Sequence, residues 1–183
     1  LQFGDGTSGA EEYCGFIKYD HSANSMSFNT NSTGRSEAKM TLDSSGFVGI
    51  GNSSPSKNLH VYNATTNRPA LIESGDADSL IEFKDNSTTN APAVGATGDS
   101  LIAQNGSSAA ERMRIDSSGN LLVGTTVPDS NSLGIGLLSS GLAFAVRDGG
   151  AAFIAHRKSS YGDIIQLKKD NAPVGSIGVK QSD

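Results

Sequence analysis

The sequence predicts an all-β fold, an elongated tandem-repeat β meander. Short runs of alternating apolar and polar residues occur along the whole chain, as in half-buried strands. No window keeps apolar residues at helical spacing for three turns, because Gly, Ser or Asn interrupts it about every ten residues. The chain also repeats blocks of its own sequence at a long period, which is typical of arrays rather than of a single catalytic domain.

Two β-hairpin blocks carry the strongest strand signal. Residues 39–51 recur as residues 112–124, 73 positions later. In both copies two alternating runs flank Asp-Ser-Ser-Gly, where Asp caps a tight turn and Gly supplies a positive φ. The predicted structural turn residues are Asp43, Gly46, Asp116 and Gly119. The apolar residues of the two hairpins are predicted to share one face, and these are Met40, Leu42, Val48, Ile50, Met113, Ile115, Leu121 and Val123.

A second block defines the length of the repeat. It begins at Leu1, Ile81 and Ile165, and each copy is followed by a glycine that opens another strand-like run. These glycines are Gly15, Gly95 and Gly175. We therefore predict repeat units at 1–80 and 81–164, with 165–183 as the start of a third unit in a piece of a longer fibre.

Further short strands are expected between stretches rich in Gly, Asn, Asp and Ser, which favour turns. The expected ranges are 15–19, 25–29, 57–62, 70–73, 80–84, 100–104, 141–147, 151–157, 163–168 and 174–179.

The composition leaves little material for a hydrophobic core. Hydrophobic residues make up 36% of the chain and aromatic residues 6%, and Gly, Ser, Asn and Thr together make 73 of the 183 residues. A monomer of this composition would struggle to offset the entropy lost on folding. Disorder would call for a higher net charge than −5 and for apolar residues without a pattern. We therefore expect the chain to bury its apolar residues against other copies of itself, with the eight hairpin residues in that core.

The charge and hydrophobicity patterns disfavour two kinds of partner, nucleic acid and membrane. No run of Lys or Arg could follow a phosphate backbone, which disfavours nucleic-acid binding. No apolar stretch approaches the ~18–20 residues that span a bilayer, so membrane insertion is not expected.

Several blocks together resemble phage tail fibres and tailspike-like proteins, which repeat the pattern R-M-x-I-D-S-S-G-x-V-G-I-G. The matching segments are 40–51 with Ser-Pro at 54–55 and Leu-His-Val at 59–61, then 112–119, and 15–28. The resemblance implies a fibrous β architecture, an intertwined parallel homotrimer and a location in the virion tail. It also implies other tail proteins as partners and a role in host attachment.

The same resemblance raises two further points. Such fibres often end in a self-cleaving intramolecular chaperone of the endosialidase type, and no segment of this chain matches that domain. The second hairpin also departs from the family pattern, since Leu122 stands where the first copy has Gly49. The two copies therefore need not pack identically.

One sequence motif points to catalysis. Residues 98–101 spell Gly-Asp-Ser-Leu, the signature of hydrolases whose Ser is the nucleophile. That chemistry needs a His oriented by an acid, usually as Asp-x-x-His, but residue 153, three before His156, is Phe. We therefore interpret Gly98-Asp99 as a turn before a strand and expect no catalytic residue.

Metal and cofactor motifs are equally incomplete. Asp76 and Asp78 could offer two carboxylates to Ca²⁺, but no loop supplies the remaining oxygens. His21, His60 and His156 have no spacing that would form a metal site within one chain. No cofactor or metal site is expected.

The sequence therefore favours a structural and adhesive role over an enzymatic one. A bacterial surface adhesin or filament remains an alternative. A tailspike-like glycan hydrolase is less favoured, because it needs paired carboxylates in a groove lined by aromatic side chains. Receptor contacts are expected in the non-repeating insertions, which are 6–14, 87–92 and 156–162. In the last of these, Arg157, Lys158 and Tyr161 suit hydrogen bonding and stacking with a host surface glycan or protein.

Overall fold

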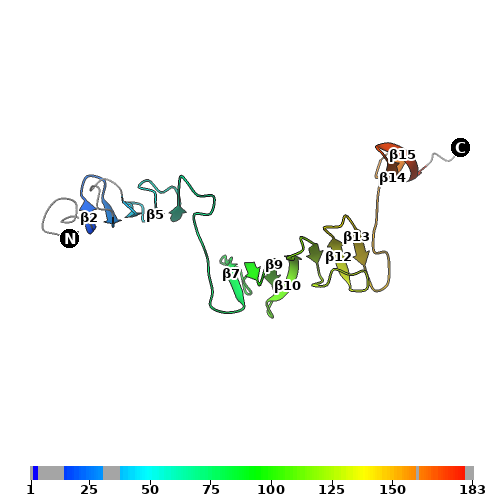
Figure 1. The fold of residues 1–183 in the computed structure, drawn as a ribbon, viewed down its shortest axis with the longest axis horizontal. Helices are drawn as coiled ribbons and strands as arrows, with labels where there is room; N and C mark the ends of the chain where they lie inside the picture. Colours follow the sequence, from blue (N-terminus) through cyan, green and yellow to red (C-terminus); the bar gives the residue numbers. More distant parts are fainter. Residues whose placement is uncertain (1, 4–14, 31–37, 160, 180–183) are drawn as a thin grey trace. The chain divides into compact units, whose positions relative to one another are not determined.

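The computed structural model describes residues 2–3, 15–30, 38–159 and 161–179 of the chain. Every regular element among these residues is a β-strand, which confirms the predicted all-β class (Figure 1). The strands form three sheets in which neighbours along the chain are also neighbours in the sheet. Two compact units, Leu1–Ile72 and Glu73–Asp183, divide the chain.

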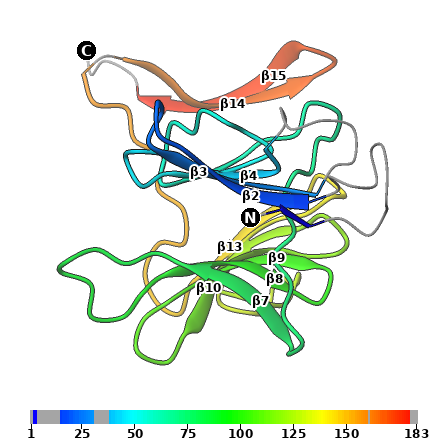
Figure 2. The same ribbon diagram turned by 90° about the vertical axis from the view of Figure 1, so that its left-hand side faces the viewer.

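Sheet A lies in the first unit and has six strands in chain order. Its pairs are antiparallel except the last, in which β6 runs parallel to β5. Figure 2 shows β2, β3 and β4 side by side. The bounds are β1 Gln2–Phe3, β2 Gly15–Asp20, β3 Ser25–Asn29, β4 Met40–Leu42, β5 Val48–Ile50 and β6 Leu59–Val61.

Sheet B lies in the second unit and has seven strands, all antiparallel to their neighbours. The order again follows the chain, from β7 at one edge to β13 at the other. The bounds are β7 Asp78–Glu82, β8 Ala93–Thr97, β9 Ser100–Asn105, β10 Ala110–Ile115, β11 Leu121–Val123, β12 Gly134–Leu137 and β13 Ala143–Val146.

Sheet C is a ribbon of two antiparallel strands, β14 (Gly162–Lys169) and β15 (Ala172–Val179). Asp170 and Asn171 form its two-residue turn with φ values of 50° and 65°. Positive φ at both central positions is the geometry that joins antiparallel strands with the natural twist.

The two Asp-Ser-Ser-Gly segments form the turns that join β4 to β5 and β10 to β11. In the first, Asp43 Oδ1 accepts hydrogen bonds from the backbone N–H groups of Ser45 (2.8 Å) and Phe47 (2.9 Å). Gly46 and Gly119 have φ values of +79° and +81°. Residues with a Cβ rarely adopt this conformation, so the turn requires glycine there.

Two expected strands are absent, and these predictions were wrong. Residues 70–73 and 151–157 form no ladder in the structure. Both have the apolar content of strands, but a strand also needs a partner whose backbone groups face its own. Their large apolar side chains are among the most exposed in the described chain, with Leu71 80%, Phe153 72% and Ile154 77% exposed.

The core within one chain is small. Among the described residues, the buried apolar side chains are Ala93, Ile102 and Leu122, all in sheet B, and Pro55, in the loop after β5. The strands are therefore held mainly by their ladders, and many of their large apolar side chains remain more than a third exposed.

Candidate functional site

One face of sheet A is lined entirely by apolar side chains. Residues directly opposite each other in neighbouring strands share a face. Met40 lies opposite Ile50, and Leu42 lies between Val48 on one side and Met26 on the other. We call this surface the apolar face of sheet A, and its members are Ile17, Tyr19, Met26, Phe28, Met40, Leu42, Val48, Ile50, Leu59 and Val61.

Sheet B has an equivalent surface. Met113 lies opposite Val123, and Ile115 lies between Leu121 and Leu101. Ser79 and Asn105 are the polar side chains that the ladders place on this side of the sheet. The other members of the apolar face of sheet B are Ile81, Val94, Ala96, Leu101, Ala103, Met113, Ile115, Leu121, Val123, Ile135, Leu137, Ala143 and Ala145.

The predicted core residues all lie on these two faces, and none is buried within one chain. Val48 and Leu121 are half-buried, and the other six are between 36% exposed (Met113) and 44% exposed (Ile50). Within its own unit, no second layer of described strands covers either face. Contiguous exposed apolar surface on this scale marks an interaction site in a protein that is stable in water.

A loop closes the opposite face of sheet A. The position of a Cβ on Gly49 would lie 2.0 Å from the carbonyl oxygen of Asn52, so glycine is required for the loop to approach. Asn52 Nδ2 lies 2.9 Å from Nδ1 of His60, which also accepts the N–H of Ser56 at 3.3 Å. The Oγ1 of Thr41, which is 3% exposed, has no hydrogen-bond partner.

Side chains rather than a loop close the opposite face of sheet B. Leu122 is fully buried and Ile102 is 1% exposed. Phe144 packs directly on Gly136, where a Cβ would lie 2.3 Å from its ring. Leu122 stands where Gly49 stands in sheet A, and this is the position at which the two hairpin copies differ in their packing.

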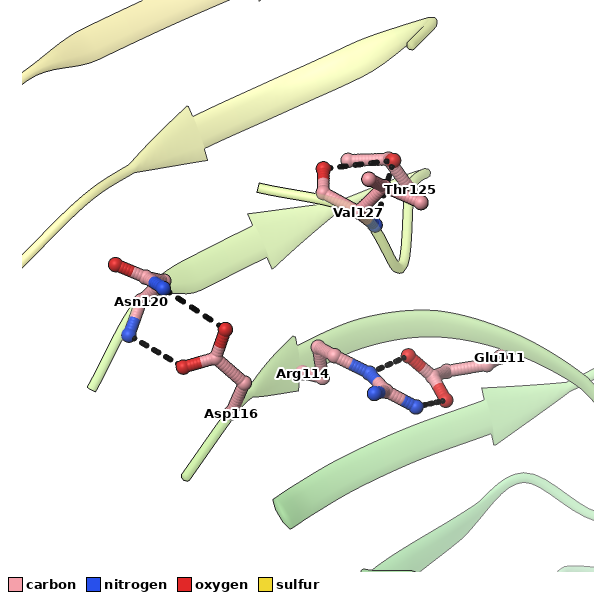
Figure 3. A network of polar contacts seen from close by, with 6 residues as sticks. All are labelled: Glu111, Arg114, Asp116, Asn120, Thr125 and Val127. Atoms are coloured by element: carbon pink, nitrogen blue, oxygen red, sulfur yellow. Dashed lines mark hydrogen bonds and ion pairs between the residues drawn. The ribbon is translucent and has the colours of Figure 1, made fainter. Parts of the chain in front are cut away.

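An ion pair lies on the same side of sheet B (Figure 3). Nε and Nη2 of Arg114 each donate to one carboxylate oxygen of Glu111 at 2.6 Å. The two side chains are 20% and 16% exposed. The hydrogen bond from Glu111 raises the pKa of Arg114 above its ordinary value. A two-bond pair of this kind fixes both side chains against the sheet.

The turn of the second hairpin is locked more firmly than the first. Asp116 accepts the side-chain N–H of Asn120 at 2.8 Å and its backbone N–H at 2.9 Å (Figure 3). Hydrogen bonds from the Asn120 side chain and backbone lower the pKa of Asp116. The Oδ1 of Asn120 in turn accepts the N–H of Ser139 at 2.9 Å, in the next turn of the sheet. The sequence motif predicted the aspartate and the glycine, but it did not point to Asn120.

A hollow of about 270 Å³ lies at the rim of the apolar face of sheet B. Its lining includes Val94 and Ala103 of that face, together with Phe83, Pro92 and Arg112. A β-bulge between Glu111 and Met113 sets Arg112 outside the regular pairing. Its Nε donates to Asn105 Oδ1 at 2.9 Å. Because the hollow continues the apolar face, we treat the two as one surface.

The predicted receptor-contact residues are separated in role. Nη1 of Arg157 donates to the carbonyl of Asp163 at 3.0 Å, and its guanidinium covers Gly162. Arg157 therefore anchors the chain at the start of β14. Lys158 and Tyr161 are exposed.

The structure describes one of the other two insertions. In the 87–92 loop, hydroxyl hydrogen bonds from Thr88 and Ser87 lower the pKa of Asp85, which organises that loop's first turn. The 6–14 insertion lies outside the described residues.

The candidate catalytic motif forms an ordinary turn. Gly98, with φ +51°, and Asp99 make a two-residue turn between β8 and β9, and Ser100 is the first residue of β9. In the described ranges, no group of three or more His, Cys, Asp or Glu side chains is close enough to hold a metal ion. No described segment forms a helix able to cross a membrane.

No protein-family model matches the chain, and no curated protein matches it in sequence.

Proposed function

We propose that this chain is a segment of a phage tail fibre, a homotrimeric virion component that contributes to host attachment. The observation that carries the proposal is the pair of apolar faces on sheets A and B, each of which no described strand of its own unit covers. A sheet with one largely apolar face is stable in water only when another surface removes that face from solvent.

A second copy is the covering surface that the chemistry favours. The residues that the ladders place on the two apolar faces include no Asp, Glu, Lys or Arg, and the charged Arg112 lies only in the hollow at the rim of sheet B, where it donates to Asn105. Such a face needs an equally uncharged partner surface, and each copy of the chain has two such faces. In a parallel assembly the matching faces meet, and three copies close around an axis with no face left open. The resemblance of the hairpin blocks to those of tail fibres supports three copies rather than two.

The mass of the particle in solution tests the assembly. Sedimentation velocity or light scattering at micromolar concentration should give three times the 18.8 kDa of one chain. The trimer should bury well over ~2,000 Å² per interface, as obligate oligomers do. A folded monomer at this concentration would contradict the proposal.

Adsorption to host cells tests the attachment role. Lys158→Ala combined with Tyr161→Ala should weaken adsorption of the assembled particle, because each contact is present three times in a trimer and losses multiply. Arg157 is kept, since it also holds the start of β14. The trimer mass of the variant serves as the control. If adsorption is unchanged, this segment is a spacer and receptor contacts lie elsewhere on the fibre.

A further inference from the structure

The starting observation is an apolar segment without a ladder. Residues 151–155 read Ala-Ala-Phe-Ile-Ala and connect β13 to β14. Phe153 and Ile154 are 72% and 77% exposed. Within the described chain, no backbone hydrogen bond involves residues 152–155. Five consecutive apolar residues gain little by remaining exposed to water, and their composition suits a strand that adds to another sheet.

The ribbon that follows lacks a partner too. Sheet C has only two strands, and an isolated two-stranded ribbon is at best marginally stable in water. Leu167 is 53% exposed, Val174 65% and Ile177 62%. A third strand would cover part of this apolar surface and would satisfy one open row of backbone groups.

The two edges of the ribbon are not equivalent. The β15 edge carries Pro173, which has no N–H to donate and which blunts an edge against strand addition. The β14 edge has no charged side chain from Ile164 to Leu167, whereas Asp163 precedes and Lys168 follows this stretch. Register shifts occur at both ends of the same stretch. The open, regular and uncharged part of β14 therefore lies between two bulges.

We infer that residues 151–155 of one copy add as a third strand to the Ile164–Leu167 edge of β14 in another copy. The five-residue segment is long enough to span this edge, whose regular pairing covers Ile165–Leu167. Both stretches are uncharged, so their pairing buries no charged side chain without a partner. Strand addition of this kind uses backbone hydrogen bonds for affinity and alternate side chains for specificity.

The first linker supports the same arrangement. Residues 70–73 also precede the first strand of a sheet, β7, and they too form no ladder. Leu71 there is 80% exposed. An exposed apolar segment ahead of an open edge strand thus occurs twice in the chain, as expected if copies exchange strands once per repeat.

The inference rests on the proposed assembly, and hydrogen–deuterium exchange of the unaltered chain separates the two. The oligomeric state is measured on the same sample. Amides of residues 152–155 should exchange at least about tenfold more slowly than those of an unstructured peptide. An oligomer in which these amides exchange at the peptide rate would overturn strand addition and leave the assembly standing. A monomer would overturn both.

Cross-linking decides which copy provides the edge. Cys14, the single cysteine of the chain, is first replaced by Ser. A variant that then carries both Ala152→Cys and Gln166→Cys is treated with a short bifunctional maleimide. Covalent oligomers on a denaturing gel are expected. Thiol loss without an increase in mass would place the contact within one chain and overturn the inference, and so would unreacted thiols. Ala152→Cys combined with Asn131→Cys is the matched control and should give no covalent oligomer.

Discussion

The hairpins β4–β5 and β10–β11 carry similar side chains on one face and different side chains on the opposite face. Their apolar faces carry Met, Leu, Ile or Val at every corresponding position. On the opposite face, Gly49 lies beneath the loop at Asn52, whereas Leu122 is itself fully buried. The comparison teaches that both hairpins keep the same apolar face, while the face opposite it, here called the outer face, can be closed in more than one way.

The largest effect is expected when a charged residue is introduced on the apolar face of either sheet. Leu42→Asp in sheet A and Ile115→Asp in sheet B should both abolish assembly. An unpaired buried carboxylate costs several kcal/mol, and a trimer would contain three. Sedimentation velocity measures the loss. Ser108→Asp, in an exposed turn, is the control and should leave the mass unchanged. If either apolar-face variant assembles normally, that face does not lie in the interface.

The outer face of sheet B should be the more sensitive to lost volume. Leu122→Ala should destabilise the chain by about 2–5 kcal/mol, because it removes a fully buried side chain and leaves a cavity. Chemical denaturation measures the change. Val127→Ala, at an exposed position outside the strands, is the comparison. An equal loss of stability for both variants would contradict the burial of Leu122.

The outer face of sheet A should be sensitive to added volume instead. Gly49→Ala places a Cβ against the carbonyl of Asn52, so the loop must move, at a cost of about 1–3 kcal/mol. The control is Gly75→Ala, where nothing lies within 4 Å of the new carbon. Similar melting temperatures for the two variants would mean that the loop does not rest on Gly49.

The two turns should respond alike to loss of glycine. Gly46→Val and Gly119→Val each force a branched residue into a positive φ, which costs roughly 1 kcal/mol or more per chain. Little surrounds either Cβ position, so the cost comes from the backbone. Asn tolerates this conformation, and Gly46→Asn and Gly119→Asn should cost less when melting temperatures are compared. An unchanged melting temperature for Gly119→Val would count against the turn.

The smallest effect should be the pH dependence of the second turn. The folded-state pKa of Asp116 is lowered by hydrogen bonds from Asn120. Its contribution to stability is therefore present above about pH 4, the usual value for Asp, and is lost as the pH falls through the lowered pKa. Asn120→Ala should move the Asp116 pKa upward toward that usual value. Carboxyl NMR titration checks this, and an unmoved pKa would assign the lowering to another cause.

Local chemistry in the sequence was sufficient for the two hairpins and their turns. The Asp-Ser-Ser-Gly segments predicted both hairpins and their left-handed glycines, and the alternation of Met40 and Leu42 with Lys39 and Thr41 predicted their shared face. The expectation that the two copies pack differently rested on Leu122 alone. These features depend on residues close in sequence, whose preferences act before any tertiary contact forms.

What only the tertiary structure decided is which strands find partners and what covers each face. Glycines interrupt β12 in sequence, yet Gly136 is the place on which Phe144 packs. Residues 70–73 and 151–157 have the pattern of strands but form no ladder. Asn120 accepts a hydrogen bond from Ser139, nineteen residues further along the chain, and so joins two turns. Pairing and covering depend on residues far apart in the chain, or on other copies, and no local pattern encodes them.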